Sequence, residues 1–214
     1  MANGFLDVAE TPSVKAAQAA NGSSEIWNNP KRRRSSDRFT VAEAEFIAAR
    51  DSFYMATVSE NGWPYVQHRG GPAGFLRMID DRTLAFADFR GNRQYISLGN
   101  IAANNRVALF LMDYPNRRRL KIYACIEAKD LKLDLELATR LTLPGYPAKP
   151  ERAFLLHLQA FDWNCPQHIT PRFTEQEIDS ALVPVRSHIA RLEAENKDLR
   201  ERLEMAAGGP NAEG

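Results

Sequence analysis

The sequence predicts a mainly β (α+β) fold, an antiparallel barrel with flanking helices, from two observations. Six or seven strand-like segments follow one another with few helical segments between them, whereas a doubly wound parallel sheet needs a helix after nearly every strand. Asn61-Gly62 stands between two of these segments, and this dipeptide is the strongest short-range hairpin signal. Both observations favour strands that pair with their neighbours in the chain.

Turn residues bound the strands, and helical patterns flank them. Thr40 and Glu43 fit a capping box that begins the first helix of the body. Asp80-Asp81-Arg82 predicts a second hairpin, and apolar residues alternate with polar ones along 120–127, as in a half-buried strand. The expected strands are 53–59, 63–69, 75–79, 83–88, 106–112, 120–127 and 153–163, and the expected helices among them are 40–48, 93–104 and 131–141.

Composition excludes several classes of function. Apolar residues make up 44% of the 214 residues, enough for a sizeable core, and the formal net charge of +1 gives no global field for nucleic acid or membranes. The longest apolar runs are too short to span a bilayer, and the N-terminus lacks the pattern of a secretory signal. Cys125 and Cys165 lack metal-ligand spacing. We therefore expect a cytoplasmic protein with no nucleic-acid, membrane or metal partner.

Three regions of the chain differ in composition and residue pattern. Residues 1–38 form an N-terminal arm, residues 39–173 the body, and residues 174–214 a C-terminal helical tail. The arm contains the basic run 31–34, which stands without interleaved aromatic residues. A solvated linker or contacts to an acidic face are favoured over a nucleic-acid patch. Nucleic-acid binding that weakens with salt would support the patch instead.

The segment 83–110 reads as strand, tight turn, helix and strand. Asn92 is a good N-cap, Gly91 suits the turn, and Arg93 takes the first helical position. A helix N-terminus favours an anion, and an Arg beside it adds a planar donor fork that suits phosphate. The segment indicates a phosphate site, and the alternative is an ordinary capped helix whose Arg faces water.

A second candidate segment lies at residues 67–75. Its glycines, Gly70 and Gly71 among them, would let backbone N–H groups approach a flat ligand beside His68 and Arg69. Arg69 could reach the phosphate that Arg93 binds. The alternative is a bulge or a wide loop between strands, with Arg69 exposed.

In sequence order, FYMATVSENGWPYVQHRGG, RTLAFADFRGNRQ and NNRVALFLMDY resemble the pyridoxamine-5′-phosphate-oxidase-like FMN-binding split barrels. The resemblance covers roughly residues 40–165. It implies an antiparallel split β-barrel and a homodimer that binds FMN in two clefts at the dimer interface.

The resemblance also implies residue roles. The family's phosphate-binding Arg maps onto Arg69. Its Ser-Arg-Lys turn maps onto Asn92, Arg93 and Gln94, and its aromatic-threonine pair maps onto Ala87 and Asp88. Two positions depart from the family pattern. Gln94 replaces a second cation, and Asp88 stands where a hydroxyl usually touches the flavin.

The Arg-x-His motif with which the B6 oxidases bind substrate phosphate is not found on a late strand. Its place is taken by a segment with Trp163, Cys165, His168 and Arg172. Trp163 and Arg172 have about the spacing of the Trp and Arg that border the flavin in the oxidases. His168 and Cys165 are the catalytic candidates, against the alternatives of a loop hydrogen-bonder and an inert thiol. The resemblance therefore supports FMN binding well and vitamin B6 oxidation poorly.

Two further features concern the flavin and the partner. Lys121 projects from its strand and could approach the flavin ring, where a cation would stabilise the anionic reduced form.

In the C-terminal helix, a single Asn at heptad position a, with Leu at d, is typical of a parallel two-stranded coiled coil. The alternative is an amphipathic helix on its own body. Position d takes Val185, Leu192 and Leu199, and position a takes Ile189, Asn196 and Leu203.

The sequence thus predicts an FMN-binding homodimer. We expect an oxidoreductase acting on an unidentified small molecule, in which FMN performs the redox step and the protein positions it. A non-catalytic flavin-binding or flavin-storage protein is the alternative.

Overall fold

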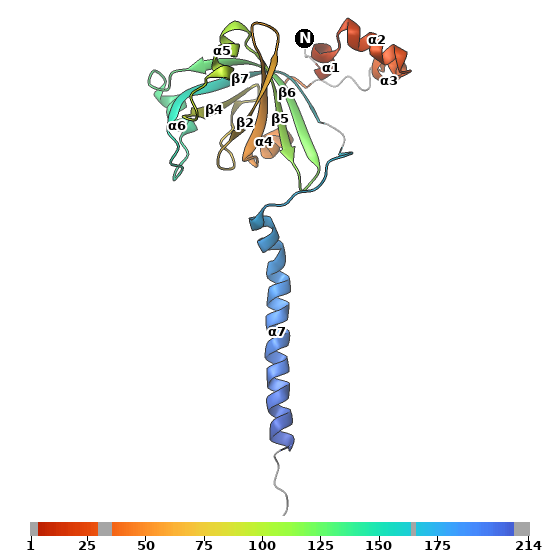
Figure 1. The fold of residues 1–214 in the computed structure, drawn as a ribbon, viewed down its shortest axis with the longest axis vertical. Helices are drawn as coiled ribbons and strands as arrows, with labels where there is room; N and C mark the ends of the chain where they lie inside the picture. Colours follow the sequence, from red (N-terminus) through yellow and green to blue (C-terminus); the bar gives the residue numbers. More distant parts are fainter. Residues whose placement is uncertain (1–3, 30–35, 164–165, 208–214) are drawn as a thin grey trace, which may run out of the picture. The chain divides into compact units, whose positions relative to one another are not determined.

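Seven antiparallel strands form one sheet in the order β2-β1-β5-β6-β7-β4-β3. The computed structural model describes residues 4–29, 36–163 and 166–207, so the basic run 31–34 lies outside the described residues. It divides the chain into two units, Met1–Thr170 and Pro171–Gly214. The predicted mainly β fold with flanking helices and a long C-terminal helix is confirmed (Figure 1).

The elements follow the expected order. The strands are β1 Ser52–Val58, β2 Pro64–Gly70, β3 Arg77–Asp80, β4 Thr83–Phe89, β5 Arg106–Asp113, β6 Arg118–Lys129 and β7 Pro150–Trp163. The helices are α1 Phe5–Ala9, α2 Pro12–Ala20, α3 Ser24–Asn28, α4 Val41–Ala48, α5 Ile96–Ala103, α6 Leu135–Leu141 and α7 Glu175–Ala207.

Local signals explain the first hairpin. Gly62 adopts a φ of +85°, in the region that glycine enters without steric cost. The Ser59 N–H donates to the Trp63 carbonyl at 2.9 Å, and Val58 pairs with Pro64. The predicted Asn61-Gly62 hairpin between β1 and β2 is therefore confirmed.

The sheet curls until its first strand meets its sixth. In the strand order, β4 lies five places from β2, yet Arg69 Nη1 on β2 lies 2.6 Å from Asp88 Oδ1 on β4. A flat sheet would hold these strands about 24 Å apart, at about 4.8 Å for each step. The curl encloses the main core, whose largest fully buried side chains are Phe53, Phe86, Phe154, Ile47, Met55, Leu76, Leu84, Leu109, Leu111, Leu120, Ile122 and Leu156.

Helix α4 begins with the predicted capping box. The Thr40 N–H and hydroxyl both donate to Glu43 Oε2, at 2.9 and 2.6 Å. The Trp163 indole N–H donates to Glu43 Oε1 at 2.6 Å, and the Trp163 ring packs edge-on against Phe46. Glu43 thus joins the helix N-terminus to the end of β7.

Helix α6 covers the outer side of β4. Leu137 and Leu141 pack on Ala85 and Ala87 of that strand in a second apolar cluster. The helix begins at Leu135 rather than at residue 131 as expected. The Asp134 carboxylate caps it by accepting from the Leu137 N–H at 2.9 Å, and residues 131–133 form a turn before it.

The N-terminal arm contains α1, α2 and α3, and α1 contacts the sheet. Phe5 stacks on Tyr123 of β6 with ring centroids 4.8 Å apart and nearly parallel planes. The Lys121 ammonium lies 4.6 Å from the centre of the Phe5 ring. The start of the arm therefore covers part of the outer face of β6.

Glu43 should give the stability of the protein an acid-sensitive component. Burial opposes its charged form, but hydrogen bonds from Thr40 and Trp163 outweigh burial and hold the pKa of Glu43 below its ordinary value. Its contribution is therefore complete above the unfolded-state pKa of about 4.3 and is lost as pH falls through the lower folded-state pKa.

Glu43→Gln should lower the free energy of unfolding at pH 7 by about 1.5–3 kcal/mol, the range for hydrogen bonds to a charged group. Denaturant unfolding between pH 7 and pH 3 should show this difference shrinking toward the acid end. Glu45→Gln, on the exposed side of the same helix, is the control. A difference independent of pH would show that the Glu43 charge plays no part.

Candidate functional site

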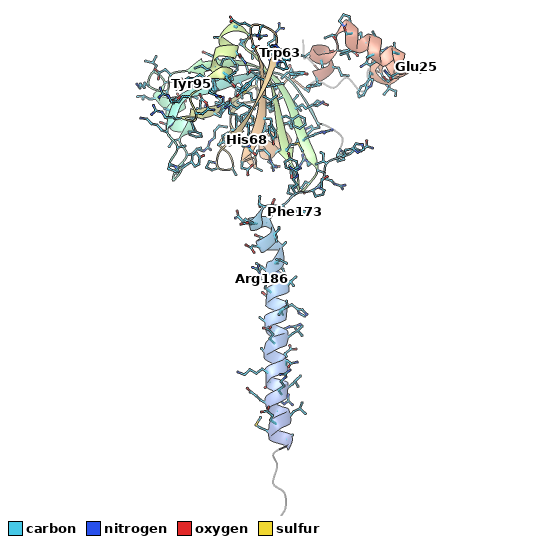
Figure 2. The ribbon with its side chains drawn as sticks, in the orientation of Figure 1. Glu25, Trp63, His68, Tyr95, Phe173 and Arg186 are labelled. Atoms are coloured by element: carbon cyan, nitrogen blue, oxygen red, sulfur yellow. The ribbon has the colours of Figure 1, made fainter. Side chains whose placement is uncertain are left out.

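A pocket of about 240 Å³ opens between the inner face of β2, the end of β4 and the start of α5. Figure 2 labels Tyr95 on the connection between β4 and α5. The lining residues are Tyr65, Gln67, Arg69, Asp88, Phe89, Gly91, Asn92, Arg93, Gln94, Tyr95, Ile96, Ser97, Leu98 and Glu151. The structure thus brings together five of the residues predicted from sequence, namely Arg69, Asp88, Asn92, Arg93 and Gln94.

Strand β2 contributes alternate residues to this pocket. Tyr65, Gln67 and Arg69 line it, because residues two apart share one face of a strand. The Ser97 hydroxyl at the start of α5 donates to Gln67 Oε1 at 2.9 Å, which joins the helix to the strand. His68, labelled in Figure 2, is on the opposite face of the strand and packs edge-on against Tyr54.

Asp88 forms the inner end of the pocket and binds two cations. Arg69 Nη1 donates to Asp88 Oδ1 at 2.6 Å, and Arg152 Nη1 lies 3.4 Å from Oδ2. The three side chains are only 10–18% exposed. The Arg69 guanidinium also lies over the rings of Phe86 and Phe154, at 5.8 and 5.7 Å. The triad therefore places charge at the edge of the apolar core.

The turn after β4 differs from the expected capped helix. Asn92 does not cap α5, because its Oδ1 accepts from the Gln94 N–H at 3.1 Å in a turn of its own. Arg93 and Tyr95 adopt positive φ of 61° and 53°, so the chain is redirected and the helix begins at Ile96. Arg93 therefore lies in the turn, three residues before the helix, and its Nε donates to the Tyr95 hydroxyl at 3.3 Å.

Glu151 supplies the second carboxylate of the pocket. It accepts from Arg90 Nε at 3.0 Å and from the Tyr95 hydroxyl at 3.1 Å. The hydrogen bond from Arg90, with that from Tyr95, holds the pKa of the Glu151 carboxyl below its ordinary value. Glu151 is therefore ionised at neutral pH.

The pocket carries an excess of positive charge. Around it the described part of the chain places four guanidinium groups and two carboxylates, and four minus two leaves +2. A phosphate monoester, at about −1.5 to −2, would balance this excess. The groups are Arg69, Arg90, Arg93 and Arg152 against Asp88 and Glu151.

Two buried nitrogens near Asp88 make no hydrogen bond with the residues that the structure describes. Arg69 Nε has no such partner, and Arg152 Nη1 has only its 3.4 Å ion pair with Asp88 Oδ2. Unpaired buried donors are costly, so an anion that accepts from them would be stabilised. The chemistry of the pocket therefore fits a phosphate group.

Three predicted cofactor residues do not line the pocket, and each packs against or pairs with a neighbouring element. A Cβ on Gly71 would lie 2.9 Å from Phe75, so close packing requires glycine there. Gly70 pairs with Ser52 at the end of the β1–β2 ladder. Ala87 is buried beneath α6, because it faces the side of β4 opposite to Asp88.

Lys121 and Trp163 lie at the other end of β7 from the pocket. Lys121 Nζ pairs with Asp162 at 2.9 Å, and Trp163 is held by Glu43 and Phe46. Glu151 is twelve residues before Trp163, about 40 Å along an extended strand. Within one copy of the chain, Lys121 and Trp163 therefore lie far from the pocket.

The predicted catalytic residues stay predictions. Cys165 lies outside the described residues, and His168 is exposed with a φ of +62°. Arg172 belongs to the second unit of the chain, where its side chain is exposed.

Sequence reasoning missed several pocket residues. Tyr65 could have been found from Arg69, since a period of two places both residues on one strand face. Arg152 and Glu151 gave no local signal, because the pairing of Asp88 with Arg152 joins strands far apart in the chain.

Two negative findings concern other kinds of site. Among the described residues, no group of three or more His, Cys, Asp or Glu side chains is placed to hold a metal ion. None of the helices in the described ranges combines the length and apolar character needed to cross a membrane.

The curled antiparallel sheet defines a split-barrel protein, and the pocket at its edge is cationic. The family model described as pyridoxamine 5′-phosphate oxidase matches residues 39–155, more than half of the chain. The chain therefore belongs to the pyridoxamine 5′-phosphate oxidase family. None of the curated proteins matches it.

Several solved structures are similar to the chain at low identity. A protein from Clostridium acetobutylicum, related to general stress protein 26 and named as pyridoxinephosphate oxidase family, is 16% identical with a TM-score of 0.45, over 64% of this chain and 95% of that one. An FMN-binding protein from Syntrophomonas wolfei is 15% identical with a TM-score of 0.45, over 70% and 97%. An F420 reductase is 24% identical with a TM-score of 0.39, over 55% and 94%.

The Asp88 carboxylate should contribute strongly to the free energy of unfolding, because it pairs with both Arg69 and Arg152. Asp88→Asn removes the charge that Arg69 and Arg152 share, and breaking a buried pair from one side costs about 3–5 kcal/mol. Denaturant unfolding of the ligand-free protein should show this loss. Asp81→Asn, which breaks the exposed pair with Arg38, should change stability little. Equal effects of the two substitutions would contradict the structural role of Asp88.

Proposed function

We propose that the protein binds FMN through its phosphate and is an FMN-dependent oxidoreductase acting on a small molecule. The observation that carries the proposal is the excess of two positive charges around the pocket that Arg69 and Arg93 line. FAD and nicotinamide dinucleotides are less suited, because the sequence has no Gly-x-Gly-x-x-Gly turn for a pyrophosphate.

The pocket suits the phosphate end of FMN. Arg69 and Arg93 would hold the phosphate with charge-assisted hydrogen bonds, and Arg152 would add positive charge from behind Asp88. A volume of about 240 Å³ is below the about 300–1,000 Å³ of pockets that bury whole drug-sized ligands. Bound FMN would supply the redox chemistry, and the flavin ring would extend beyond this pocket.

A second copy of the chain would complete the site. The outer face of β1 and β2 exposes Tyr54, Val58 and Val66. Trp63, which Figure 2 labels, is exposed in the hairpin that joins these strands. An exposed apolar patch of this kind marks an interaction surface. The family resemblance favours a homodimer with the cofactor between copies, and Lys121 would then belong to the surface available to the other copy.

The substrate is proposed to differ from pyridoxamine 5′-phosphate. The sequence lacks the Arg-x-His motif, so the substrate phosphate would lose its partners. The segment 163–172 stands in its place, and His168 is the residue within it that we propose for substrate contact.

A non-catalytic flavin-binding protein is the second candidate, and one observation favours it. Both carboxylates of the pocket are held in ion pairs, Asp88 by two Arg and Glu151 by Arg90. Neither is placed as a free acid or base for proton transfer.

Two measurements test the function. The absorption spectrum of the purified protein, with mass analysis of any released cofactor, should identify FMN. Reduced nicotinamide should then bleach the bound flavin, and reoxidation with repeated turnover should follow if the protein is an enzyme. Flavin that is bound but never cycles would favour storage, and efficient turnover of pyridoxamine 5′-phosphate would overturn the proposed difference in substrate.

Arg93→Ala should weaken FMN about ten- to a hundredfold, since one charge-assisted partner of the phosphate is lost. Riboflavin, which lacks the phosphate, should lose much less affinity. Fluorescence titration of the variant and of the unmodified protein gives the loss of affinity for each ligand. Arg117→Ala is a matched control, because Arg117 is also exposed with a positive φ, of 53°. Equal losses for FMN and riboflavin would place Arg93 away from the phosphate.

A further inference from the structure

Helix α7 carries a continuous apolar stripe that its own unit leaves in water. The helix has 33 residues, about 50 Å at 1.5 Å per residue. Each apolar member of the stripe is 38–69% exposed. The stripe comprises Ile178, Leu182, Val185, Ile189, Leu192, Asn196, Leu199 and Leu203.

The spacing of the stripe is that of a coiled coil. Its eight residues follow one another at steps of four and three without interruption, so the pattern begins at Ile178, before the six positions from Val185 to Leu203. Positions d hold Ile178, Val185, Leu192 and Leu199, and positions a hold Leu182, Ile189, Asn196 and Leu203. Pro184 falls at position c, outside the stripe, and the helix continues through it.

We propose that α7 forms a parallel, in-register two-stranded coiled coil with α7 of a second copy of this chain. In such a pair each a residue faces its own counterpart, so Asn196 meets Asn196 and the two amides can hydrogen-bond. An antiparallel pair that overlaps the whole stripe would instead set Asn196 against Val185 and leave the amide unpaired. The single polar position therefore selects the parallel arrangement.

The charges beside the stripe also fit a second copy. In a parallel pair, position g of one helix lies beside the next e position of the other. Glu195 at g would meet Arg200, and His188 at g would meet Glu193. Within one helix, the i,i+4 pairs Lys197–Glu201 and Asp198–Arg202 lie outside the stripe and stabilise the helix itself. The partner that fits both the apolar and the charged positions is the same sequence.

Disulfide trapping of the full-length chain tests the arrangement. Asn196→Cys should bring two thiols together at one position a, and mild oxidation should give a covalent dimer. Ser187→Cys, at position f on the opposite side of the same helix, is the matched control. Cross-linking of Asn196→Cys should be roughly tenfold or more faster, because pairing raises the effective concentration of the thiols. Equal rates at the two positions would overturn the proposal.

Further variants separate this interface from others. Leu192→Asp with Leu199→Asp should abolish the Asn196→Cys cross-link, whereas Ala194→Asp at position f should leave it intact. A mixture of Val185→Cys and Asn196→Cys chains that cross-links to each other faster than Asn196→Cys does to itself would show the antiparallel pair and refute the parallel one.

The coiled coil is independent of the proposed flavin site. Val66→Asp, on the exposed sheet face, should weaken contact between barrels yet leave the Asn196→Cys cross-link in place. FMN affinity should in turn persist in the protein with Leu192→Asp and Leu199→Asp. Loss of the cross-link in Val66→Asp would show that α7 does not pair by itself, and would contradict the proposal without touching the phosphate pocket.

Discussion

The contact of Arg69 with Asp88 closes the curled sheet of the first unit, because it joins two strands five places apart in the strand order. Removing these charges from water has a cost that their attraction only partly offsets, so the contact is not the main source of stability. That source is the apolar core that the curl encloses. The ion pair instead sets where the two parts of the curled sheet meet, since only one register brings guanidinium and carboxylate together at 2.6 Å.

The same contact shapes the pocket. Asp88 neutralises part of the charge of Arg69 and Arg152, and an incoming phosphate must share these cations with a resident carboxylate. Two buried donor nitrogens near Asp88 nevertheless stay without a hydrogen bond in the described part of the chain. In Arg69, closure of the barrel uses Nη1, whereas Nε is the donor left for an anion. Asp88, which departs from the family pattern, is therefore compatible with the phosphate site that we propose.

Features that depend on residues close together in the sequence were predicted, whereas features that depend on which strands pair were not. The Asn61-Gly62 hairpin and the Thr40–Glu43 capping box depend on residues within one turn, and both were predicted. The start of α5 was predicted three residues early, because the Asn92 side chain bonds to the Gln94 N–H and makes a turn instead of a cap. Arg69 and Arg93 could be predicted as neighbours from the family pattern, whereas Arg152 enters through the pairing of β4 with β7, which no local pattern records.

The two apolar surfaces of the chain differ in what they specify. The outer face of β1 and β2 offers apolar area, and area alone favours association without fixing a partner. The stripe on α7 combines apolar residues with the Asn196 amide at one position a, and charges of opposite sign stand beside it at positions g and e. In a pair of helices these features penalise wrong registers and wrong partners. If both surfaces act, the helix supplies selectivity for the same chain, and the sheet face supplies contact beside the flavin.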